Sequence, residues 1–147
     1  MKRFLFGLCL FFFVAASWEV GAWDKIDYQR LMATKKCVKC DLTEAYLSGA
    51  DLVFTNLSGV NLSGADLSEA NLFYGNLSAA DLTEANLSGA DLTEANLFGA
   101  NFSAADLSGA DLNEVNLSAA NLEGANLTET KFCETKMPNG TTGNSGC

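Results

Sequence analysis

The chain repeats one pattern of apolar and polar residues every five positions between residues 40 and 139. The centre of each quintet is large and apolar: it is Leu everywhere except at Phe102, Phe132 and Met137. A step of five turns an α-helix by about 140°, and it moves the side chains of a flat strand to alternate faces. A backbone that turns a corner once per quintet instead points every centre at one interior axis. The pattern therefore predicts a solenoid with one narrow apolar core.

The residues around each centre suit close packing and tight turns. The residue two positions before the centre is Ala in thirteen of the twenty quintets, which lets the backbone approach the core. The next residue is Asp or Asn in seventeen quintets, and these types hydrogen-bond locally at turns and tolerate unusual backbone angles. Ser or Thr usually follows the centre and supports the same turns. The last position is mostly Gly, Ala or Glu and is expected to face solvent.

This motif, A-[DN]-L-[ST]-x, strongly resembles the pentapeptide-repeat family. The resemblance implies an all-β fold, a right-handed quadrilateral β-helix with four quintets per coil and about five coils. The expected organisation is a signal peptide at 1–22, an N-terminal cap at 23–39, the β-helix at 40–139 and a C-terminal cap tail at 140–147.

The first 22 residues have the features of a secretory signal. Lys2 and Arg3 precede an apolar run at 4–16, which is too short to span a bilayer comfortably. Small residues lead up to Ala22, so cleavage is expected after it. An uncleaved membrane anchor is the alternative. We expect a secreted or periplasmic protein with no stable membrane span after cleavage.

Both ends of the solenoid are expected to be covered, because an open edge invites association. Residues 26–33 have modest helical character, with Asp24 as a candidate N-cap. This short helix would lay Trp23, Ile26 and Leu31 over the first coil. At the other end, the Pro-Asn-Gly stretch at 138–140 predicts a turn that terminates the repeat.

Cleavage after residue 22 would leave four cysteines, Cys37, Cys40, Cys133 and Cys147. On the implied solenoid Cys40 and Cys133 lie in the first and fifth coils, roughly 19 Å apart, which exceeds the reach of a disulfide. We therefore expect one bridge at each end, Cys37–Cys40 and Cys133–Cys147. The alternative for the CxxC pair is redox chemistry, which nearby lysines would favour by lowering the pKa of a thiol. The βαβ context of thioredoxin-like proteins is missing, which favours structural bridges.

Composition narrows the functional classes. The chain has 18 acidic and 9 basic residues, so its acidic surface opposes direct nucleic-acid binding. It has no His, which removes the commonest general base and metal ligand. The carboxylates repeat along exposed sides without an evident pocket, and a solvated acidic face is favoured over a weak calcium site. We expect no catalytic residue, metal site or cofactor, and hence no enzyme.

Four exposed aromatic residues are the candidate partner-binding site. Residues twenty apart would stack on one side of the solenoid, which places Phe54, Phe73 and Tyr74 together on its third side. Phe98 would lie across the next corner, on a fourth side that has no acidic residue. An exposed aromatic patch is typical of an interaction site. The alternative is that single surface aromatics are ordinary and have no function.

These observations favour a non-enzymatic secreted or periplasmic scaffold that binds a protein partner. The resemblance implies an alternative, because some acidic family members mimic duplex DNA and bind DNA gyrase. The signal sequence and the neutral fourth side oppose that alternative. The resemblance also implies a homodimer through the C-terminal end, which the expected cap and disulfide would oppose.

Overall fold

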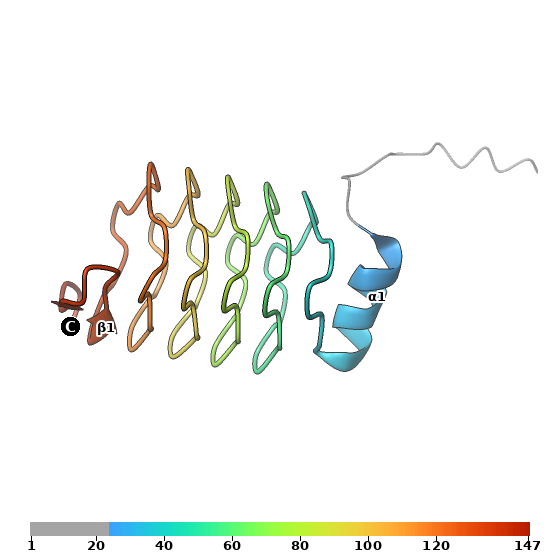
Figure 1. The fold of residues 1–147 in the computed structure, drawn as a ribbon, viewed down its shortest axis with the longest axis horizontal. Coiled ribbons are helices and arrows are strands. Elements are labelled where there is room, and N and C mark those ends of the chain that lie inside the picture. The colour runs from blue at the N-terminus through green and yellow to red at the C-terminus, as the bar shows by residue number, and fades with distance from the viewer. Residues whose placement is uncertain (1–23) are drawn as a thin grey trace, which may run out of the picture.

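The computed structural model describes residues 24–147, and most of them wind into a stack of similar coils (Figure 1). The predicted signal peptide and Trp23 lie outside the described residues. Isolated parallel bridges join residues twenty apart, from Lys36 with Asn56 to Asn116 with Lys136. Each coil therefore takes twenty residues, or four quintets. Along this side the bridges run from Lys36 to Lys136 in five such steps.

Hydrogen bonds between coils follow one repeating rule. The N–H of a quintet centre donates to the carbonyl nineteen residues later, as from Leu62 to Asp81 at 2.7 Å. A second bond runs the other way, from the N–H of the residue before a centre to a carbonyl in the preceding coil, as from Asp66 to Ala45 at 2.9 Å. These pairings stay single because the chain turns a corner after each one. In the described residues the only strands longer than one bridge are β1 (Thr135–Lys136) and β2 (Thr142–Gly143), which pair antiparallel.

The core is the column of quintet centres. Every centre from Leu42 to Leu117 is at most 1% exposed, and Phe102 fits in the same column. The inward-leucine prediction is therefore confirmed. Thr55 and Thr135 occupy buried positions that are usually Ala, and each hydroxyl donates to a backbone carbonyl at 2.6 Å. Because these hydroxyls are satisfied, they do not disturb the apolar column.

The turns follow a rule that sequence reasoning assigned to the wrong residue. The last residue of every quintet from Lys39 to Glu134 has a positive φ, between 55° and 71°. The preceding Asp or Asn accepts a hydrogen bond from the N–H two residues later, as in Asp41 with Thr43 at 3.1 Å. The Asp/Asn residues therefore act at the turns as predicted, but the left-handed residue comes three positions later. Glycine is common there because it adopts positive φ without steric cost.

The helix α1 (Lys25–Thr34) lies across the N-terminal end of the stack (Figure 1). The Asp24 side chain caps it by accepting from the Ile26 N–H at 2.7 Å, as predicted. Leu31 is fully buried, but Ile26 is 66% exposed, so its predicted burial is wrong. The two residues are five apart, which places them about 140° apart around the helix. Within the described part of the chain, no helix is long and apolar enough to cross a bilayer.

The ladder of bridges begins at Lys36, earlier than the boundary expected at residue 40. Cys37 takes the place of a quintet centre: it is fully buried, and its N–H donates to the Asn56 carbonyl at 2.8 Å. The sequence hid this quintet because Lys-Cys stands where Asp/Asn-Leu is usual. A buried half-cystine supplies the apolar volume instead.

The C-terminal tail folds back over the last coil as a β1–β2 hairpin (Figure 1). Its turn lies in the predicted region, with Gly140 at φ 83°. The Phe132 N–H donates to the Ser145 carbonyl at 2.7 Å, and Phe132 is 9% exposed. The tail does not cover the whole end, because Leu122 and Leu127 remain only partly buried. Two of the four sides are therefore left without a cap.

Candidate functional site

The structure brings three of the four predicted partner-binding residues together. The Phe54 and Tyr74 rings are stacked, with centroids 5.4 Å apart and planes 19° apart. The Phe73 ring meets Tyr74 edge-on at 4.5 Å and Phe54 at 6.3 Å. Phe54 is 69% exposed and Tyr74 45%, so the rings lie outside the core. We call Phe54, Phe73 and Tyr74 the aromatic cluster.

Phe98 is not part of this cluster. It is 52% exposed, and the ring contacts found among residues 24–147 join only the three members of the aromatic cluster. Its N–H donates to the Asn96 side chain at 3.2 Å, which places it on the fourth side. The corner between two sides therefore separates Phe98 from the other three residues.

The aromatic cluster continues into a group of carboxylates. Interaction of the Tyr74 hydroxyl with Glu94, together with burial and the charges of Glu94 and Glu114, raises the pKa of the phenol. Glu94 and Glu114 occupy the same quintet position as Tyr74, one and two coils further on. At the N-terminal end of this side, the Lys35 ammonium lies 3.6 Å from the Asp51 carboxylate. The site is thus aromatic at one end and acidic beyond it.

Both expected cysteine pairs lie at bonding distance. The S–S distance is 2.01 Å for Cys37–Cys40 and 2.16 Å for Cys133–Cys147. Cys37 is fully buried and Cys40 is 3% exposed. Thiol–disulfide exchange needs access to a sulfur atom, so this burial favours a structural bridge over redox chemistry.

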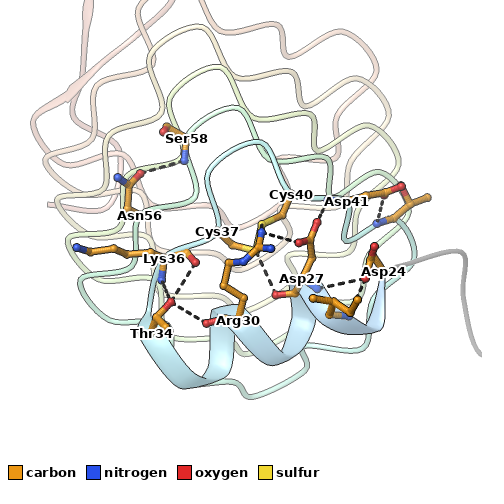
Figure 2. The surroundings of a disulfide bond; sticks show 12 residues. Asp24, Asp27, Arg30, Thr34, Lys36, Cys37, Cys40, Asp41, Asn56 and Ser58 are labelled. Atoms are coloured by element: carbon orange, nitrogen blue, oxygen red, sulfur yellow. Dashed lines mark hydrogen bonds and ion pairs between the residues drawn. A yellow bond between two sulfur atoms is a disulfide. The ribbon is translucent and has the colours of Figure 1, made fainter.

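Two residues missed by sequence reasoning surround the first disulfide. Figure 2 shows Arg30 reaching from α1 toward Asp27 and the Cys37–Cys40 bridge. The Arg30 guanidinium lies 2.7 Å from the Asp27 carboxylate and 3.7 Å from the Cys40 sulfur. Asp27 also accepts from the Asp41 N–H at 2.9 Å, which ties the helix to the first coil. The i,i+3 spacing of opposite charges was a weak signal for this pair.

Asp27 and the two sulfurs lie within 4.8 Å of one another, close enough to hold a metal ion if all were free ligands. The sulfurs are bonded to each other, however, and a metal ion needs thiolates. In the disulfide state the group therefore offers only one carboxylate.

A shallow cavity of about 220 Å³ lies on the first side of the solenoid. Gly64 lies between Glu44 and Glu84, which are one coil away on either side, and a Cβ at Gly64 would lie 3.3 Å from the Glu44 Cγ. Its walls offer hydroxyl and carboxylate oxygens, and both glutamates are exposed to solvent. The lining residues are Thr43, Glu44, Ser63, Gly64, Thr83 and Glu84.

The last coil also presents unpaired backbone groups on its two uncovered sides. In the preceding coil, the Phe102 N–H donates to the Asn121 carbonyl and the Leu107 N–H to the Asn126 carbonyl. The equivalent N–H groups of Leu122 and Leu127 have no hydrogen-bond partner within residues 24–147. We call these two partly buried leucines and their free N–H groups the open C-terminal edge.

Comparison with known proteins identifies the repeat. The model of pentapeptide repeats matches in eight copies, over residues 36–73, 76–113 and 110–139. The chain belongs to the pentapeptide-repeat family. The match begins at residue 36, where the ladder of bridges also begins. Solved pentapeptide-repeat structures identify the fold of this chain as a right-handed β-helix.

One similar structure is HetL, a pentapeptide repeat protein involved in heterocyst differentiation regulation in the cyanobacterium Nostoc sp. strain PCC 7120. It is 37% identical with a TM-score of 0.71, over 74% of this chain and 51% of HetL. This pentapeptide-repeat chain therefore spans about half the length of HetL. A trypsin-treated form of QnrB1, a plasmid-mediated fluoroquinolone resistance protein, is 21% identical with a TM-score of 0.54, over 69% of this chain and 62% of QnrB1. That likeness shows the fold alone. Among curated proteins, none matches this chain.

Proposed function

We propose that this pentapeptide-repeat protein is a non-enzymatic scaffold that binds a protein partner through the aromatic cluster. The observation that carries the proposal is the exposed stack of Phe54 on Tyr74, with Phe73 packed against both. Phe54 and Tyr74 are held at φ 56° and 55°, where bulky residues are unfavourable. Exposed aromatic rings contribute little to folding but supply large contact area at interfaces.

The proposed location is the periplasm or the extracellular space, with a mature chain that starts at Trp23. The signal-like start of the sequence supports this, and so do the two disulfides, which persist in oxidising compartments. Cell fractionation and N-terminal sequencing test the proposal. A full-length chain recovered from the cytoplasm would refute it.

The interaction test compares two variants in which exposed aromatic residues are replaced by Ser. In the first, Phe54, Phe73 and Tyr74 are all replaced by Ser; in the control, only Phe98 is replaced by Ser. Both should fold, because none of these side chains belongs to the core. Affinity capture from the envelope fraction should recover a partner with the wild type and the control, but not with the triple variant. Recovery of the same amount of partner with the triple variant would show that the aromatic cluster does not take part in the interaction.

The second candidate is an acidic mimic of DNA that binds a DNA-handling enzyme such as gyrase. It is supported by the charge of residues 40–139, which hold 15 acidic residues and two lysines. The fourth side, which has no acidic residue in this range, weakens the mimicry. A supercoiling assay with residues 23–147 tests it: no inhibition of gyrase at a large molar excess would exclude this candidate.

We also propose that two copies associate through the open C-terminal edge. Partly exposed Leu122 and Leu127 beside unpaired N–H groups favour edge-to-edge pairing. Light scattering on the purified protein should give a dimer mass, and Leu127→Lys should give a monomer without loss of the coils. A monomeric wild type would show that the hairpin blocks this contact.

A further inference from the structure

The aromatic cluster is the first part of a longer strip on the third side. The last quintet positions of this side, one coil apart, are occupied in order by Phe54, Tyr74, Glu94, Glu114 and Glu134. Backbone bonds keep these coils in register, with the Tyr74 N–H on Thr93 at 3.1 Å and the Glu94 N–H on Asn113 at 2.9 Å. Two exposed rings are therefore followed by three carboxylates along one line.

Negative charge is concentrated on this side by the neighbouring Asp positions. Asp91 and Asp111 are bridge partners in consecutive coils, so two carboxylates are stacked directly. On the first and second sides an amide stands next to the acid instead, as where Asn101 donates to Asp81 at 3.4 Å and Asn86 donates to Asp66 at 3.4 Å. The Lys131 ammonium, 3.5 Å from Asp111, offsets part of the charge at the C-terminal end.

Resting on the interaction function proposed above, we infer that the third side binds an extended, basic segment of the partner protein. One Arg or Lys of the segment lies on the Phe54 and Tyr74 rings, and the next lies over Glu94 and Glu114. An aromatic face attracts a cation, and the planar guanidinium of Arg stacks well on it. The carboxylates beyond the rings then supply the opposite charge for the second cation.

The spacing of the strip predicts the spacing of the basic residues. Neighbouring coils are about 4.8 Å apart, so the midpoint of the Phe54 and Tyr74 rings and the midpoint of Glu94 and Glu114 are separated by two coils, or roughly 10 Å. An extended segment in the polyproline II conformation has three residues per turn and rises about 3.1 Å per residue, so residues three positions apart lie on the same face and about 9 Å apart. The segment is therefore expected to carry basic residues three positions apart. A nucleic acid would be repelled by the same carboxylates.

The probe is an acetylated, amidated peptide of sequence Arg-Ala-Ala-Arg-Ala-Ala-Arg, with a Glu-for-Arg peptide as its negative control. Titration calorimetry gives the dissociation constant, and the aromatic proton resonances report contact with the rings. Phe54→Ala and Glu94→Gln should each raise the Kd about threefold to tenfold. Phe98→Ala and Glu69→Gln are the matched controls, because Glu69 has the same quintet position on the second side; they should change the Kd by less than about twofold.

The outcomes separate this inference from the proposed function. Equal effects of Glu94→Gln and Glu69→Gln, with no effect of Phe54→Ala, would show general attraction to an acidic protein and would overturn the inference. No binding of the peptide, with capture of a partner still lost in the triple aromatic variant, would overturn the basic segment while leaving the scaffold function intact. If the aromatic substitutions reduce neither peptide binding nor capture of the partner, both the basic-segment inference and the proposed scaffold site are wrong.

Discussion

Replacing Leu82 by Ala tests the single core on which the architecture depends. Leu82 is fully buried, and its neighbours in the column, Leu62 and Phe102, are fully buried as well. Truncation removes three carbon groups, which costs about 2.4 kcal/mol at roughly 0.8 kcal/mol each. The neighbours are held in register by the bridges and cannot fill the space, so the cavity raises the expected cost to about 2–5 kcal/mol.

Leu127→Ala is the matched control for this prediction. It deletes the same atoms in the last coil, where the side chain is only partly buried and no further coil packs on it. We expect a cost of about 1 kcal/mol there at protein concentrations low enough to keep the chain monomeric, because less apolar area leaves water on folding. Urea unfolding followed by circular dichroism, with the disulfides intact, gives both free energies of unfolding. If Leu82→Ala costs no more than Leu127→Ala, the column of leucines does not dominate stability.

Three further changes test the turns, the tail and the pH response. Hydrogen bonds from Ser108 hold the pKa of Asp106 below its usual range. The carboxylate therefore stabilises the fold above about pH 4, and this stability is lost as the pH falls through the lowered pKa. Asp106→Asn should make the melting temperature less dependent on pH in the acid range. Cys147→Ser removes the Cys133–Cys147 disulfide, whose restriction of chain entropy in the unfolded state contributes about 3 kcal/mol to stability. Hydrogen exchange should therefore become faster in residues 132–147, while the middle coils stay protected. A Cβ added at Gly99 meets nothing within 4 Å, but φ stays at 67°, so calorimetry of Gly99→Ala should show a loss of about 1–2 kcal/mol from the backbone alone.

The fold was largely readable from the sequence because the repeat is redundant. Twenty quintets impose the same local geometry, so single departures such as Phe102 or Thr55 did not hide the period. The aromatic cluster was also readable, since a twenty-residue coil places Phe54 and Tyr74 in the same column. Phe98 could be assigned to the next side, but the separation of its ring from the other three needed coordinates.

Other features depended on contacts that no period contains. Ile26 and Leu31 both suit a helix, and only the docking of α1 decided which of them faces the core. Cys37 replaces a leucine without the surrounding motif, so the start of the solenoid was misplaced by one quintet. The Arg30 contacts with Asp27 and Cys40 join α1 to the disulfide, and helix periodicity does not report such contacts.

The sequence by itself determined the five-residue period, the inward column of leucines and the stacking of residues twenty apart, because each quintet repeats the same local and nearest-neighbour interactions. Only the tertiary structure decided what happens where the repeat stops. There α1 covers the first coil, whereas the hairpin covers two sides of the last coil and leaves Leu122 and Leu127 partly exposed. The ends are each built once from unrelated residues, so no repetition in the chain encodes how they pack.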